Sequence, residues 1–171
     1  MKKLLKVVFV IVSVFLVVGL LLPSEVYVER SQQINRPVEE VFIQVAELRN
    51  WEGWMPWIES DTTIVTTWSD KTMGVGGYYT WTSGMGGGRL EVLEFEENKR
   101  MLTEVGVGDY GVGYGHWNFE SNSDGVNVFW GMSMDFGNNL FMRWMGLCME
   151  SMVGSEFEKG LKNLKSVCED Q

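Results

Sequence analysis

The last thirty or so residues, 139–169, constrain the fold more than any other stretch of the chain. Apolar residues recur here three to five positions apart, and that spacing keeps them on one stripe of an α-helix. The stripe consists of Met142, Met145, Met149, Met152, Phe157, Leu161, Leu164 and Cys168. Charged residues occupy the other side, so the helix is amphipathic and must lie against another element. Its glycines at 146, 154 and 160 each cost about 1 kcal/mol relative to Ala, so we expect packing against a surrounding sheet to hold it together.

The N-terminus has the pattern of a membrane anchor. Lys2, Lys3 and Lys6 precede a run from Val7 to Leu22 that only Ser13 and Gly19 interrupt. A helix starting at residue 4 would reach about 28 Å, close to the ~30 Å of a hydrocarbon core. The alternative is a cleaved signal peptide, but the run ends without small residues in a cleavage pattern. We therefore predict an anchor over residues 1–23, with a cytoplasmic N-terminus and an extracytoplasmic domain over 24–171.

The charge balance of the domain excludes one class of partner. The chain has a formal net charge of −9. All 23 of its acidic residues lie beyond the anchor, against 11 of its 14 basic ones, which leaves the domain at −12. Such a surface repels phosphate backbones and anionic lipid heads. We therefore expect no nucleic-acid partner.

The cysteines predict neither a disulfide nor a nucleophile. Cys148 and Cys168 stand twenty residues apart on one predicted helix, about 30 Å, whereas a disulfide needs Cα atoms within ~7 Å. We expect Cys148 to be a small core residue and Cys168 a thiol in the tail. The single histidine, His116, also argues against His-based metal sites, and we predict neither a metal nor a cofactor.

Between anchor and final helix, the pattern predicts one strand, two short helices and a six-stranded meander. The first strand covers about 26–35, and helices follow over 37–47 and 48–57. The remaining strands are expected at 62–69, 77–82, 89–96, 100–107, 116–121 and 126–135, with short links typical of antiparallel pairing. A glycine pattern at 106–111 matches the dinucleotide-binding fingerprint in letters only, because a strand and not a helix follows it.

The segment 37–57, with Trp51, Trp54 and Trp57 at spacings of three, resembles the opening of the START-like (SRPBCC) superfamily, in its polyketide cyclase/dehydrase branch. The segments Gly74-Val-Gly76, Tyr79-Thr-Trp81, Arg143-Trp-Met-Gly-Leu147 and Phe157-Glu-Lys-Gly-Leu-Lys-Asn-Leu164 fit the same branch. The resemblance implies an α+β helix-grip fold, in which an antiparallel sheet curls around a long C-terminal helix with a hydrophobic cavity between them. Carriers, binders and ring cyclases share this fold, so the resemblance transfers no catalytic residue.

Composition adds a specific expectation about the space between sheet and helix. The chain has 8 Trp, 11 Met, 9 Phe and 5 Tyr, which serve equally for a filled core or for an apolar cavity. The leading hypothesis is a membrane-tethered domain that binds a hydrophobic small molecule or lipid. Candidate lining residues are Trp54, Trp57, Tyr79, Trp81, Trp117, Trp130, Met134, Met145 and Met149.

Two other classes of function stay open at this point. An enzyme of cyclase or hydrolase type would need an acid or base inside the cavity, and His116, Asp135 and Tyr79 are the candidates. A structural or partner-binding module would have a filled core instead. The orientation of these three side chains distinguishes the first class from the others.

Overall fold

The computed structural model describes residues 2–84, 86–108 and 111–170, and of residue 59 only the backbone. An N-terminal helix α1 (Lys2–Leu21) leads into strand β1 (Glu25–Ile34), which is followed by α2 (Val38–Ala46), the 3-10 helix η1 (Leu48–Gly53) and α3 (Pro56–Ser60). Six strands come next: β2 (Val65–Trp68), β3 (Tyr78–Ser83), β4 (Gly86–Glu96), β5 (Arg100–Val107), β6 (Val112–Asn122) and β7 (Gly125–Asp135). The long helix α4 (Leu140–Glu169) closes the chain.

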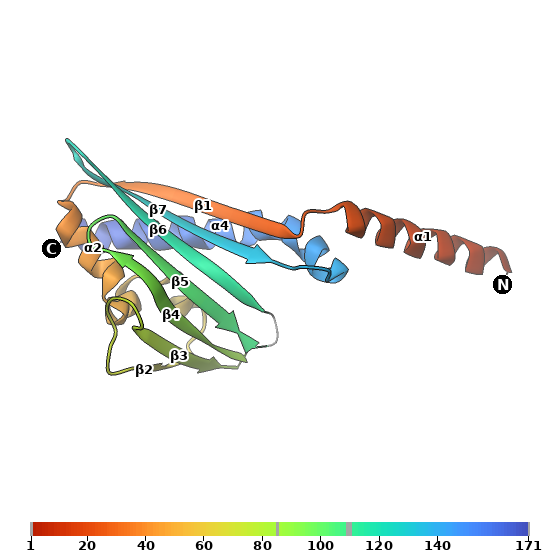
Figure 1. Cartoon of the computed structure of the whole chain (residues 1–171), viewed down its shortest axis with the longest axis horizontal. Coiled ribbons are helices and arrows are strands. Elements are labelled where there is room, and N and C mark those ends of the chain that lie inside the picture. Colours follow the sequence, from red (N-terminus) through yellow and green to blue (C-terminus); the bar gives the residue numbers. More distant parts are fainter. Residues whose placement is uncertain (1, 85, 109–110, 171) are drawn as a thin grey trace.

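The seven strands form one antiparallel sheet in the order β1-β7-β6-β5-β4-β3-β2. The sheet curves, and α4 runs along its concave side while α1 projects beyond the domain (Figure 1). This is the predicted α+β helix-grip fold, with an apolar helix in front of it. The predicted strands and the helix over 37–47 are confirmed with small shifts at their ends, except that β6 begins at Val112 and not at His116. The helix predicted over 48–57 is instead two elements, η1 and α3, which are separated before Pro56.

Alternation along the strands decides which side chains form the core. In β7, Val126, Val128 and Trp130 are buried, and in β6, Trp117 and Phe119 are buried beside them. Neighbours in sequence point to the opposite, convex face, because side chains alternate along a strand. The second half of α4 covers this core with Phe157, Leu161, Leu164 and Cys168.

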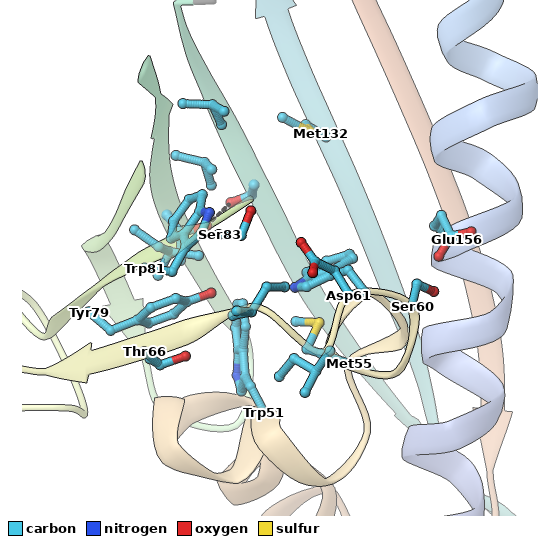
Figure 2. A pocket seen from close by; sticks show the side chains of 18 of the residues that line it. Trp51, Met55, Ser60, Asp61, Thr66, Tyr79, Trp81, Ser83, Met132 and Glu156 are labelled. Carbon is cyan, nitrogen blue, oxygen red and sulfur yellow. Dashed lines mark hydrogen bonds between the residues drawn. The ribbon is translucent and has the colours of Figure 1, made fainter. Parts of the chain in front are cut away.

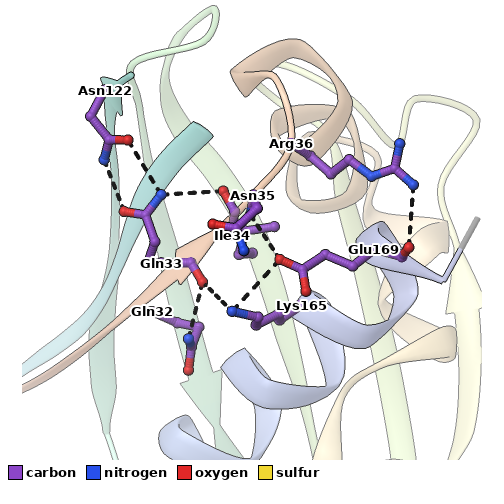
Figure 3. Close-up of polar contacts among 8 residues, drawn as sticks. All are labelled: Gln32, Gln33, Ile34, Asn35, Arg36, Asn122, Lys165 and Glu169. Atoms are coloured by element: carbon purple, nitrogen blue, oxygen red, sulfur yellow. Dashed lines mark hydrogen bonds and ion pairs between the residues drawn. The ribbon is translucent and has the colours of Figure 1, made fainter. Parts of the chain in front are cut away.

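The C-terminal end of α4 is fastened to the end of β1 by polar contacts (Figure 3). The Lys165 ammonium donates to the Gln33 carbonyl at 2.9 Å, and the Glu169 carboxylate accepts from the Asn35 amide at 2.8 Å. Arg36 donates to the Glu169 carbonyl at 3.2 Å. These bonds fix the register of the helix on the sheet at one end, whereas its first half depends on other contacts.

The first half of α4 packs through glycines and not through its methionines. A Cβ at Gly146 would lie 2.9 Å from Val26, and one at Gly154 would lie 2.1 Å from the Arg30 guanidinium. Met145 and Met152 are 41% and 60% exposed. The predicted methionine stripe therefore does not pack on the sheet in this half of the helix, because the glycine side makes the close approach to β1 and Met152 borders an open pocket instead.

The expectation for the two cysteines is reversed. Cys148 is exposed and Cys168 is buried, because the sheet supports the end of α4 and not the segment around Cys148. Burial raises the pKa of the Cys168 thiol to about 11, and only the thiolate is nucleophilic. In a Cys148→Ser variant at neutral pH, we expect Ellman's reagent to react with no thiol until a denaturant unfolds the chain. Fast reaction of the folded variant would contradict the burial of Cys168.

Candidate functional site

An aromatic stack joins the sheet to α4 at the floor of the concave face. The rings of Trp117 and Trp130 are stacked with centroids 4.5 Å apart, and Trp130 stacks on Phe157 of α4 at 4.0 Å. The ring of Trp51, in η1, is tilted against that of Trp117 with centroids 5.7 Å apart. Trp54, the residue after η1, meets Trp117 edge-on with centroids 5.9 Å apart. The tryptophan segment after α2 therefore packs across the sheet against the same rings that hold the helix.

A pocket of about 530 Å³ lies above this stack, between the sheet, the η1–α3 segment and the middle of α4 (Figure 2). This volume falls within the range typical of small-molecule sites. Most of the lining is apolar, with aromatic rings, branched aliphatic residues and methionines. The apolar side chains include Trp51, Met55, Trp57, Ile58, Ile64, Trp68, Trp81, Leu90, Val105, Val107, Trp117, Trp130, Met132, Met152, Val153 and Phe157.

The polar groups of the pocket are few, and their charges have one sign. They are the carboxylates of Asp61 and Glu156 and the hydroxyls of Ser60, Thr66, Tyr79, Ser83 and Thr103. None of the described residues that line the pocket is Lys, Arg or His. The lining therefore offers hydrogen-bond acceptors and hydroxyls, but no cation to balance a negatively charged ligand.

Asp61 is fixed by its own chain neighbours. Its carboxylate accepts from the amide and the hydroxyl of Thr63. These bonds, the hydroxyl's first, hold the pKa of Asp61 below its ordinary value, because they favour the charged form. The carboxylate is therefore ionised at neutral pH.

Three indole N–H groups and one tyrosine hydroxyl lie at or beside the pocket, and they differ in whether the protein supplies a hydrogen-bond acceptor. The indole N–H groups of Trp51 and Trp54 donate to the carbonyls of Val45 and Gln44. The indole N–H of Trp117 is buried and has no acceptor among the residues that the structure describes. Burial raises the pKa of the Tyr79 hydroxyl, which keeps it protonated and able to donate.

The structure brings together part of the set of lining residues predicted from the sequence. Trp57, Tyr79, Trp81, Trp117 and Trp130 line the pocket. Trp54 is 2% exposed and packs in the core beside Trp117 and Trp130. Met134 lies two residues beyond Met132 on the same face of β7, and Met145 and Met149 lie on α4 before the turn that reaches the pocket. That any of these residues contacts a ligand stays a prediction.

Sequence reasoning missed several lining residues. Met132 shares a strand face with Trp130, so alternation could have identified it. Met152 belonged to the predicted helical stripe, but nothing in the helical pattern showed that Met152 and not Met149 would line the pocket. Asp61 and Ser83 lie outside the hydrophobic pattern, and their positions at the pocket depend on how the segment after α3 folds back.

The candidate acid and base residues do not gather at the pocket. His116 lies on the convex face of β6, where its Nε2 is 2.9 Å from the Ser133 hydroxyl and its ring meets Tyr27. The exposed Asp135 accepts from the Gly137 amide at the start of the loop before α4. Tyr79 alone of the three lines the pocket. Among the described residues, no group of three or more His, Cys, Asp or Glu side chains could hold a metal ion.

A curved sheet that grips a long helix over an apolar pocket defines a ligand-binding type of domain. The sequence profile described as "Polyketide cyclase / dehydrase and lipid transport" matches residues 25–169. The chain therefore belongs to this family. Comparison with curated protein sequences found no match.

Solved structures of the same fold come from several bacteria. The protein CV1439 from Chromobacterium violaceum is 14% identical, with a TM-score of 0.63 over 84% of this chain and 98% of that one. SA2116 from Staphylococcus aureus, described as of unknown function, is 13% identical, with a TM-score of 0.65 over 85% and 94%. DynU16, from the dynemicin biosynthetic locus, is 14% identical, with a TM-score of 0.61 over 85% of this chain and 48% of that one. At these identities the likeness concerns the fold alone.

Proposed function

We propose that this domain binds an apolar, hydroxyl-bearing small molecule in the pocket between sheet and helix, while α1 tethers it to a membrane. The observation that carries the proposal is the lining itself, an apolar space of about 530 Å³ with two carboxylates and no basic residue among those described. Burial of apolar ligand surface, at about 25 cal/mol per Å², would supply most of the affinity. The family description, which includes lipid transport, agrees with a ligand of this kind.

The few polar groups favour a neutral or cationic head over an anionic one. A ligand hydroxyl offers a donor to the carboxylates at Asp61 or Glu156 and an acceptor to the hydroxyl groups of the lining, such as that of Tyr79. A ligand carboxylate or phosphate would meet like charges with no nearby cation to offset them. We therefore infer that fatty acids and phosphate-bearing lipids are poor ligands.

The tether is supported by the composition of α1 and by its contacts. Among the described helices, α1 alone, with its 20 residues, is long and apolar enough to cross a membrane. At 1.5 Å per residue it would extend about 30 Å. The lysines at its start favour a cytoplasmic N-terminus. Its contacts with α4 favour retention of the segment over removal as a signal peptide.

Two measurements on the full chain in lipid nanodiscs test this function. Native mass spectrometry would detect a co-purified small molecule that is released on denaturation. Titration with decanol, decylamine and decanoate, with empty nanodiscs as the blank, then compares three heads on one apolar chain. We expect decanoate to bind at least about tenfold more weakly than the other two, a difference of about 1.4 kcal/mol. Equal affinities for decanol, decylamine and decanoate would contradict the inference that the carboxylates disfavour an anionic head. No binding in either experiment would make a partner-binding module the better interpretation.

An Asp61→Asn variant tests the source of the head-group preference. We expect it to weaken decylamine binding and to reduce the discrimination against decanoate. In the unchanged chain the preference for decylamine over decanoate should persist at neutral pH and fall only as the pH drops through the lowered pKa of Asp61. Glu120→Gln removes an exposed carboxylate from β6, outside the pocket, and is the matched control. The same effect from both variants would show that only the overall charge matters.

A further inference from the structure

The start of α4 lies beside the apolar helix α1, at one end of the sheet. Glu25 of β1 pairs with Asp135 of β7, and Met134 of β7 pairs with Gly113 of β6. The start of β1, the end of β7 and the start of β6 therefore lie at the same end of the sheet. The α1–β1 junction, the turn into α4 and the start of β6 all gather there (Figure 1). Whatever surrounds α1 is therefore also next to this end of the domain.

The contact between α1 and α4 reaches well into the apolar part of α1. The rings of Phe15 and Trp144 are stacked 4.9 Å apart and nearly parallel, and the Trp144 indole N–H donates to the Phe15 carbonyl at 3.3 Å. Gly19 leaves room for this ring, since a Cβ there would lie 3.0 Å from the indole nitrogen. Phe15 is six residues before the end of α1, about 9 Å along the helix axis. If α1 crosses a bilayer, Trp144 must enter that bilayer as well.

The first turns of α4 are suited to such an environment. Between Leu140 and Met149, Arg143 is the only charged residue. Its guanidinium donates to the carbonyls of Gly137, Leu20 and Leu22, so it satisfies backbone groups and holds α4 to the end of α1. The apolar side chains are nevertheless uncovered by protein, with Phe141 66% and Leu147 57% exposed. Apart from Arg143, whose charge is directed at backbone carbonyls, this helical segment is apolar around its circumference and belongs in an apolar surrounding.

We propose that this segment, residues 140–149 of α4, is a membrane-docking surface that inserts into the interface of a lipid bilayer, beside the point where α1 leaves it. The proposal rests on the tether of the proposed function. Tryptophan and tyrosine prefer the interface, and Val112 and Tyr114, both exposed at the start of β6, lie at the same end of the sheet. The acidic domain gains nothing from anionic lipids, so insertion depends on apolar burial into neutral lipid.

Docking at this surface would place the pocket next to the bilayer. The next turn of α4 after the docking surface carries Met152 and Val153, both of which line the pocket. Val107 at the end of β5 and Gly86 at the start of β4 lie at this same end of the sheet and line the pocket as well. An apolar ligand could then pass between bilayer and pocket over the methionine side of α4 without crossing water.

Fluorescence of the full chain in phosphatidylcholine vesicles tests the docking. The environment-sensitive dye NBD is attached at position 147 through a Leu147→Cys substitution in a Cys148→Ser background, where the buried Cys168 does not react. A matched variant, Ile43→Cys, carries the dye on α2 at the opposite end of the domain, where the native side chain is 43% exposed. We expect blue-shifted emission at position 147, quenched by nitroxide-labelled lipid and not by iodide, and the reverse at position 43. A Phe141→Cys variant repeats the measurement at a second docking position.

The outcomes separate docking from tethering. Water-like emission at both 147 and 141, in protein that alkaline carbonate does not extract from the vesicles, would overturn the docking surface and leave the tether intact. Blue-shifted emission in protein that carbonate does extract would support docking and contradict α1 as a membrane span. Equal lipid quenching at positions 147 and 43 would also overturn the proposal, because it would indicate nonspecific adsorption.

Discussion

Replacing Trp130 by Ala is expected to lower the free energy of unfolding by about 4 kcal/mol. Removal of a buried aromatic ring usually costs about 3–5 kcal/mol. Trp130 is 4% exposed, and its ring is stacked between Trp117 on one side and Phe157 on the other. Its loss would leave a cavity at the point where sheet and helix meet. For a chain of this size, such a change lowers the melting temperature by roughly 8–16 °C.

Thermal unfolding of the detergent-solubilised chain, followed by near-ultraviolet circular dichroism, measures this effect. Trp81→Ala is the matched control, because Trp81 is half-buried at the pocket and lies outside the stack of Trp117, Trp130 and Phe157. We expect the control to lose less than half as much stability. An equal loss from both variants would mean that the stack has no special part in joining helix to sheet.

Introducing a side chain at Gly160 is expected to have a comparable effect. A Cβ at this position would lie 2.7 Å from the Trp130 ring and 3.1 Å from the Pro56 ring. Both neighbours are rigid, so the helix itself would have to move. Gly160→Leu should therefore cost about 3 kcal/mol, the upper part of the range for overpacked cores, although leucine has a higher helix propensity than glycine by about 1 kcal/mol.

The sign of this effect distinguishes packing from propensity. Ser166→Leu places the same side chain at an exposed position of the same helix, where we expect a change within about 0.5 kcal/mol. Denaturant unfolding of both variants in the same detergent gives the comparison. Stabilisation by Gly160→Leu would show that α4 does not approach Trp130 closely at this glycine.

Local patterns in the sequence predicted the elements well because those patterns act over short distances. Alternation fixed the buried faces of β6 and β7, down to Trp117 and Trp130. Pro37 precedes α2, as expected of a proline at the start of a helix. The helix predicted over 48–57 was expected to stop at Pro56, but Pro56 begins α3 instead, because a proline at the first helical position loses no hydrogen bond. The sequence after residue 111 indicated a strand, but the strand was predicted to begin only at 116, because the glycines at 113 and 115 carry no side chain to show alternation. Because glycine has no side chain, Gly113 leaves room for Met132 and Gly115 leaves room for Thr103.

The orientation of α4 could not be predicted in the same way. Helical periodicity shows which residues share a side of a helix, but not which side meets the sheet. The glycines at 146, 154 and 160, counted from the sequence only as a cost, allow α4 to approach Val26, Arg30 and Trp130 closely. The methionine side of the first half is consequently left open, and the exposure of Cys148 follows from the same choice.

The sequence by itself therefore determined the order of elements, the antiparallel sheet with its long closing helix, the apolar N-terminal segment and the acidic surface. Only the tertiary structure decided that Trp54 is enclosed in the core whereas Trp57 and Trp81 line a pocket, that Asp61 and Glu156 are the charges beside it, and that Trp144 packs on Phe15. The physical reason is range. Propensity and alternation act between near neighbours along the chain, whereas a pocket and a helix contact are formed by residues that only the folded backbone brings together.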